Sequence, residues 1–176
     1  MTEAPQDKIT LGVLSDTHGW LDPELITHFE HVDHILHAGD IGHPDVLEQL
    51  KQLAPLSVVR GNIDGGDLRF EPLEVVLEVG GKRFAIRHIC GSPKRPNSAT
   101  RDFLMREQPD VLIVGHSHIP VVAKVLDTLW VNPGAAGRQG FHDQRYAMFI
   151  HIDRQTGELS MDRIHLGARA KDLFGA

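Results

Sequence analysis

Acidic, amide and imidazole side chains follow several apolar stretches of the sequence, at the points where those stretches stop. The sequence reads GVLSDTH, HILHAGD, SVVRGN and VLIVGHSH at these points, and His88 closes a further stretch. The residues concerned are Asp16, His18, Asp40, Asn62, His88, His116 and His118. Carboxylate oxygens and imidazole nitrogens bind divalent cations. One such cluster is typical of a solvated turn, but its repetition at successive strand ends predicts a metal centre.

The elements that would position these residues alternate between strand and helix in the first third of the chain. Strands are expected at 9–14, 34–37 and 56–59, where short apolar runs are rich in β-formers. Helices are expected after Asp22, a capping residue followed by proline, and from Pro44 to the residue before Pro55. This β-α-β-α-β order predicts a parallel sheet with ligands at the carboxyl ends of its strands.

The remainder of the chain has a different pattern, dominated by strands. Strands are expected at 73–79 and 82–88 around a Gly-Gly turn, at 110–114, and then at 121–126, 129–131, 145–152 and 158–165. A helix is expected at 98–107, after a loop at 89–98, and a surface tail at 167–176. Together these elements predict a mixed, layered α/β fold.

Composition limits the class of protein and its surroundings. The chain has 176 residues, of which 41% are hydrophobic and 24% charged, so one domain over residues 1–176 is expected. The net charge of −6 disfavours a broad basic face for nucleic acid. Cys90 is the single cysteine, and no apolar run approaches the ~20 residues of a membrane span. A cytoplasmic protein without a disulfide or a membrane anchor is therefore expected.

The ordered set D-x-H, G-D, G-N, H and G-H-x-H resembles the calcineurin-like metallophosphoesterases, and more narrowly their small bacterial and archaeal phosphodiesterases. The resemblance runs from about residue 9 to residue 137. It implies a layered α/β sandwich with two mixed β-sheets flanked by helices. It also implies two divalent ions, one held by Asp16, His18, Asp40 and His118 and the other by Asp40, Asn62, His88 and His116, with Asp40 as the bridge.

The chemistry of two metal ions calls for these residue types. Two divalent ions about 3.5 to 4 Å apart repel each other, and a shared carboxylate with a bridging hydroxide offsets that repulsion. The donors fit Mn, Fe, Ni or Zn, and Mn is expected by analogy. We therefore expect hydrolysis of a small phosphate ester, a phosphodiester by preference, through a metal-bridging hydroxide that attacks phosphorus. Asp40, Asn62 and His116 are the expected catalytic residues.

Some positions depart from the family pattern. Many members have a histidine after the Gly-Asn pair that helps to protonate the leaving oxygen, whereas this chain has Ile63. An alkoxide that leaves without a proton costs several kcal/mol more, so esters with acidic leaving groups are favoured. Ile89 and Cys90 follow His88 where glycine is usual, and Ala135 replaces the serine of the usual N-P-G-S turn that begins at Asn132.

Several further residues and functions remain open at this stage. His37 is expected to be a core or supporting histidine, and Lys94 and Arg95 to be solvated, with phosphate binding as the alternative. The remaining histidines, which are expected to be solvated or satisfied locally, are His28, His31, His34, His43, His142, His151 and His165. The alternative function is a protein-binding scaffold, as in the eukaryotic retromer subunit of the same fold. Nucleic acid is considered only as a substrate, and relatives suggest a homodimer or homotetramer.

Overall fold

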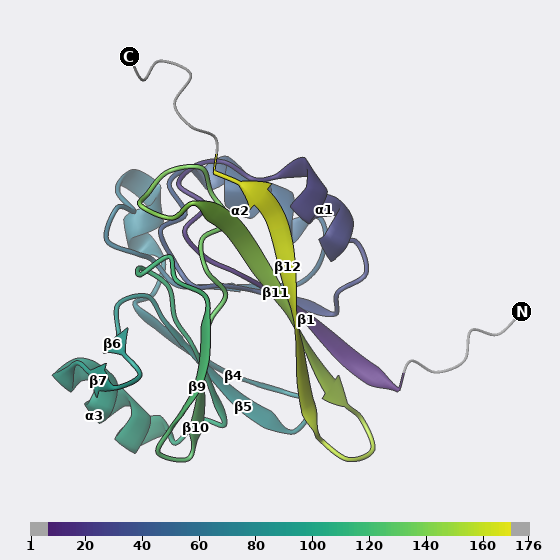
Figure 1. The fold of residues 1–176 in the computed structure, drawn as a ribbon, viewed down its shortest axis with the longest axis vertical. Coiled ribbons are helices and arrows are strands. Elements are labelled where there is room, and N and C mark those ends of the chain that lie inside the picture. Colours follow the sequence, from purple (N-terminus) through teal and green to yellow (C-terminus); the bar gives the residue numbers. More distant parts are fainter. Residues whose placement is uncertain (1–6, 170–176) are drawn as a thin grey trace, which may run out of the picture.

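The structure, a computed structural model, describes residues 7–169 and contains two five-stranded β-sheets with helices on their outer faces (Figure 1). The strands of these sheets are β1 (Lys8–Leu14), β2 (His34–His37), β3 (Leu56–Val58), β4 (Glu74–Val79), β5 (Lys82–Arg87), β8 (Val111–Ile113), β9 (Val121–Val125), β10 (Thr128–Asn132), β11 (Gln144–Asp153) and β12 (Leu159–Ala168). The helices are α1 (Pro23–Phe29), α2 (Pro44–Lys51), the 3₁₀ helix η1 (Gly66–Phe70) and α3 (Ser98–Glu107). Two short strands, β6 (Gly91–Ser92) and β7 (Arg95–Pro96), pair as a hairpin.

Both sheets mix parallel and antiparallel pairs. The first sheet has the order β12-β11-β1-β2-β3, in which β1, β2 and β3 are parallel and β11 runs antiparallel to β1. The second has the order β4-β5-β8-β10-β9, in which β5, β8 and β10 are parallel. The predicted β-α-β-α-β start and the predicted sandwich of two mixed sheets are therefore confirmed.

Three apolar clusters hold the layers together. Leu11 and Val13 of β1 pack between the sheets against Phe84 and Ile113 of the second sheet. Leu14 of β1 packs instead in a cluster under α1 and α2, and a third cluster joins α3 to the outer face of the second sheet. Both faces of β1 are buried along its second half, which explains why its sequence there is a nearly continuous apolar run. Figure 1 shows α3 at the opposite end of the molecule from α1 and α2.

Local signals account for most element boundaries. The Asp22 side chain accepts a hydrogen bond from the backbone N–H of Glu24 at 2.9 Å, and Pro23 follows at the first helical position, as predicted. The hairpin β6–β7 lies within the segment predicted as a loop, and η1 was not predicted. Gly167 and Ala168 of the predicted tail end β12, whereas residues 170–176 lie outside the described residues. None of the helices within residues 7–169 is long and apolar enough to cross a membrane.

Replacing Phe29 by alanine should lower the free energy of unfolding by about 3 to 5 kcal/mol, because a fully buried ring is lost. A Cβ atom at Gly12 of β1 would lie 2.9 Å from that ring, so the ring packs directly on the strand backbone. Urea unfolding followed by circular dichroism measures the change. Phe70→Ala is the matched control, since Phe70 is 75% exposed and should cost less than about 0.5 kcal/mol. An equal loss in both variants would contradict this core assignment.

Candidate metal centre

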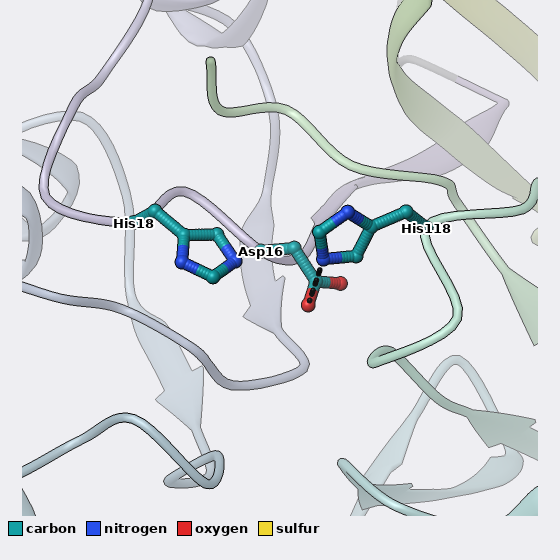
Figure 2. Close-up of side chains that lie close together, drawn as sticks. All are labelled: Asp16, His18 and His118. Atoms are coloured by element: carbon teal, nitrogen blue, oxygen red, sulfur yellow. Dashed lines mark ion pairs between the residues drawn. The ribbon is translucent and has the colours of Figure 1, made fainter. Parts of the chain in front are cut away.

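The structure brings all the candidate ligands together where strands of the two sheets end. Asp16 and His18 follow β1, Asp40 follows β2 and Asn62 follows β3. The second sheet supplies His88 after β5 and the pair His116 and His118 after β8. Figure 2 shows Asp16 and His18 on the loop that follows β1 and His118 on a second loop, with their side chains close together. The predicted convergence at one edge of the fold is therefore what the structure has, although two sheets share in it rather than one.

One group of donors consists of Asp16, His18 and His118. The Nε2 atom of His118 lies 3.2 Å from Asp16 Oδ1, the ion pair drawn in Figure 2. The Nε2 atom of His18 is buried and has no hydrogen-bond partner within the described residues. A buried polar atom without a partner is costly, and a bound cation would supply the missing partner.

The second group consists of Asp40, His88 and His116, and the amide oxygen of Asn62 lies beside two of its members. That Oδ1 atom lies 2.9 Å from His116 Nδ1 and 3.2 Å from His88 Nε2. Asp40 Oδ1 is also 3.2 Å from His88 Nε2. The other ring nitrogen of His88 is 2.7 Å from the carbonyl oxygen of Ala38, which turns Nε2 toward the centre. Oxygen and nitrogen donors thus cluster closely enough to surround one cation.

Asp40 contacts both groups, with one carboxylate oxygen directed to each. Its Oδ1 faces His88, whereas its Oδ2 lies 3.7 Å from His18 Nε2. Burial acts to raise the pKa of Asp40, but hydrogen bonds from His88 and the backbone N–H of Ile63 outweigh it and lower the pKa below its usual value. Burial lowers the pKa of His18 in spite of both carboxylates, so the neutral, metal-binding form of this imidazole is favoured.

The backbone at the centre is held in an unusual conformation. The non-glycine residues with positive φ within residues 7–169 are Asp16, His18, Asp40, His116, His118, Gln108 and Leu126. All but the last two are candidate ligands. Left-handed backbone is uncommon outside glycine and concentrates at functional sites. This conformation turns the chain sharply at the ends of β1, β2 and β8 and directs these side chains inward.

Glycines beside the ligands allow the loops to approach each other. A Cβ atom at Gly61 would lie 2.0 Å from Asp40 Oδ1, and one at Gly115 would lie 2.8 Å from His88 Nδ1. Neither contact is compatible with a side chain. The Gly-Asn and Gly-His pairs of the sequence therefore serve close packing as well as turning.

Two supporting residues escaped the sequence analysis. The Asp64 carboxylate accepts hydrogen bonds from the backbone N–H groups of Gly61 at 2.7 Å and Gly42 at 2.9 Å, and so ties the loops after β2 and β3 together. Its position just after the Gly-Asn pair was the available signal. His142, expected to be solvated or satisfied locally, has a local contact with the carbonyl oxygen of Gly137, but its Nδ1 also lies 2.9 Å from Nδ1 of His118, 24 residues away.

The other residues considered from the sequence lie outside the two donor groups. Asn132 donates to the carbonyl oxygen of Gly115 and to Ser117 Oγ, both at 3.0 Å, and so fastens the loop that carries His116 and His118. Cys90 is buried, and burial raises the pKa of its thiol to about 12, as suits a passive residue. Lys94 and Arg95 are exposed on the hairpin β6–β7.

Two hollows open beside the centre. The first, of about 230 Å³, is lined by ligands such as His18 and His118 together with Ile63 and Phe141. Phe141 is fully exposed and Ile63 is 44% exposed, so the rim of this hollow is apolar. The second, of about 140 Å³, is lined by His88, Leu73 and other residues. Asn62 lines both hollows and so lies between them.

Comparison with known proteins gives matches along most of the chain. A family model described as the calcineurin-like phosphoesterase superfamily domain matches residues 9–155. A probable metallophosphoesterase of Methanothermobacter thermautotrophicus is 33% identical over 163 residues, which cover 90% of this chain and 93% of that protein. A solved structure described as a novel archaeal phosphodiesterase has a TM-score of 0.67 at 24% identity and covers 89% of this chain and 100% of its own.

Another similar structure is vacuolar protein sorting 29 from Cryptosporidium parvum. Its TM-score is 0.69 at 18% identity, and the match covers 92% of this chain and 100% of that one. At these identities the two solved structures show a shared fold and nothing further.

His37 should make stability fall in mildly acidic solution. Its Nε2 lies 3.0 Å from Thr17 Oγ1 and its Nδ1 accepts from the Gly39 N–H, and complete burial lowers its pKa from 6.5 to about 4. Because the unfolded chain takes up the proton more readily, the contribution of His37 is fully present above pH 6.5 and is lost as the pH falls to about 4. The loss amounts to about 3 kcal/mol.

The measurement is urea unfolding of metal-free protein, with a chelator present, between pH 7 and pH 4. His37→Gln should flatten the dependence of the unfolding free energy on pH, because glutamine does not titrate. His165→Gln is the control, since it makes the same exchange at an exposed histidine of β12. Identical slopes for the parent protein and His37→Gln would refute the prediction.

Proposed function

Because the chain belongs to the calcineurin-like phosphoesterase superfamily, we propose that it is a metal-dependent hydrolase whose preferred substrates are phosphodiesters. The observation that carries the proposal is the meeting of two donor groups at Asp40, which directs one oxygen to each. A protein-binding scaffold would not need this complete set of donors. Their convergence therefore supports hydrolysis over a purely structural role.

We propose that the chain holds two divalent cations. Asp16, His18, Asp40 and His118 would bind one of them, and Asp40, Asn62, His88 and His116 the other. The donors are oxygen and nitrogen atoms without a thiolate, which fits manganese as well as iron, nickel or zinc, and manganese is the expected ion. When bound, the cations would supply a water nucleophile that is active near neutral pH and would offset the charge of the phosphoryl oxygens.

The side chains of the centre differ in exposure, and we assign them different roles on this basis. Asp16, Asp40 and His88 are buried and hold fixed positions, whereas Asn62 and His116 are exposed. The exposed pair would face the phosphate and orient it, which is why Asn62, His116 and the shared Asp40 are proposed as catalytic residues. Preorganised groups of this kind need no rearrangement as charge develops on the phosphoryl oxygens.

The two hollows support a diester as substrate. A monoester has one organic substituent, whereas a diester has two, and Asn62 lies between two hollows that would each take one. Ile63 and Phe141 make one rim apolar, and Leu73 and Ile89 do so on the other side. Burial of apolar surface against these side chains would favour esters with apolar or aromatic substituents.

Asp40→Asn should abolish most hydrolysis of bis(p-nitrophenyl) phosphate in the presence of Mn²⁺. Removing the charge shared by both donor groups should lower kcat/KM by at least about 100-fold, since the loss of a supporting residue alone costs 10- to 100-fold in such sites. Elemental analysis should also find less bound metal. Asp67→Asn is the control, because Asp67 is exposed on η1. Full activity of Asp40→Asn with two metals bound would refute the assignment, and silence of the parent protein with every metal would favour the scaffold.

Ile63→His should extend activity to esters with poor leaving groups. A positioned general acid contributes about 10²- to 10⁴-fold, and Ile63 lacks a proton to donate. We expect kcat/KM for an alkyl nitrophenyl diester to change little and that for an unactivated alkyl phosphate to rise roughly tenfold or more. Ile63→Val is the control for altered packing. If the parent protein already hydrolyses the alkyl phosphate as fast as the nitrophenyl diester, the role given to this position is wrong.

A further inference from the structure

A histidine outside the expected ligand set contacts one of the candidate ligands. His142 lies in the loop that precedes β11, and its Nδ1 is 2.9 Å from Nδ1 of His118. Its other ring nitrogen, Nε2, is 3.0 Å from the carbonyl oxygen of Gly137. The two imidazole rings meet edge to face, with centroids 4.9 Å apart. His142 thus lies between a backbone acceptor and the side of His118 that faces away from Asp16.

The chemistry of these contacts determines where the hydrogens are. A carbonyl oxygen only accepts hydrogen bonds, so Nε2 of His142 must donate to Gly137. In a neutral imidazole the remaining nitrogen is an acceptor, so Nδ1 of His142 carries no hydrogen. The hydrogen between the two Nδ1 atoms then belongs to His118. The hydrogen on Nδ1 leaves Nε2 as the nitrogen of His118 that can bind a cation. In metal-free protein Nε2 lies 3.2 Å from Asp16 Oδ1, where it would donate a hydrogen to the carboxylate until a cation replaces that hydrogen.

The same loop also restrains the ring of His118 sterically. Gly140 has a φ of +128°, and a Cβ atom there would lie 2.2 Å from Nδ1 of His118. The backbone therefore passes too close to the ring for any side chain. Burial lowers the pKa of His142, which favours its neutral form, and it is the neutral ring that accepts a hydrogen bond from His118.

We propose that His142 is a positioning residue that holds His118 in its Nδ1–H tautomer, so that His118 presents the lone pair of Nε2 to a divalent cation beside Asp16. Metal-binding histidines commonly donate their second N–H to a carboxylate, a carbonyl or water. In this chain a second imidazole, itself anchored to Gly137, takes that place. The inference rests on the proposed role of His118 as a ligand, but the tautomer can be measured in metal-free protein.

The first experiment reads the tautomer directly. Metal-free protein with ¹⁵N-labelled histidine is studied by long-range ¹H–¹⁵N NMR, and His118→Gln identifies the signals of that ring. We expect Nδ1 of His118 to carry a hydrogen in the parent protein and to lose it in His142→Phe, because phenylalanine offers no acceptor. An Nδ1 of His118 without a hydrogen in the parent protein, or an unchanged Nδ1 in His142→Phe, would overturn the inference.

The second experiment measures metal affinity with Mn²⁺ as the probe, by calorimetric titration. His142→Phe keeps an aromatic ring but lacks the acceptor, and should weaken the affected site by roughly 10- to 100-fold. His142→Asn can still accept from His118 through its amide oxygen and should bind much more tightly than His142→Phe. The matched control is His31→Phe, because His31 is exposed and remote from the centre. Equal affinity in all variants, or an equal loss in both His142 variants, would overturn the inference.

The two experiments separate this inference from the proposed function. If the parent protein binds none of Mn²⁺, Fe²⁺, Ni²⁺ and Zn²⁺ while Nδ1 of His118 carries a hydrogen, the proposed function fails and the hydrogen bond from His118 to His142 stands. If a metal binds while Nδ1 of His118 carries no hydrogen in the metal-free protein, the role of His142 fails alone.

Discussion

The burial of two carboxylates close to each other is the constraint on which the arrangement of this protein depends. Asp16 is completely buried and Asp40 is 3% exposed, and in the described part of the chain their ion pairs are with histidines rather than with lysine or arginine. An isolated buried carboxylate is costly, so the surrounding loops must supply donors. The backbone N–H groups of Ile63 and His116 do so in part. The remaining demand is for positive charge, which a pair of cations would meet.

The buried carboxylates and the imidazoles that contact them come from both sheets. The first sheet provides both carboxylates and Asn62, whereas the second provides three of the imidazoles, His88, His116 and His118. The apolar residues between the sheets, such as Val13 and Ile113, set the distance at which the two sets of loops meet. A displacement of one sheet against the other would separate the oxygen donors from the nitrogen donors. The packing between the two sheets therefore sets the geometry of the centre.

Most of the fold, and the place of each candidate ligand at the end of a strand, could be predicted from the sequence, because the signals are local. Prolines and capping residues mark α1 and α2, and each ligand directly follows an apolar run whose end fixes its place at the sheet edge. The contact of His142 with His118 could not be predicted, since His142 lies in a loop with no periodic pattern and its partner is 24 residues away. The backbone ties made by Asp64 were missed for the same reason, because they join loops that only the tertiary fold brings together.

Backbone strain affects which substitutions this fold accepts. The left-handed residues of the centre are Asp16, His18, Asp40, His116 and His118. Replacing any of these residues by glycine would relieve roughly 1 kcal/mol of backbone strain, because glycine adopts this conformation without steric conflict. Glycine at these candidate ligand positions would therefore relieve backbone strain in the metal-free protein. If the proposed hydrolysis is what retains these side chains, its loss would let such substitutions accumulate while the fold persists.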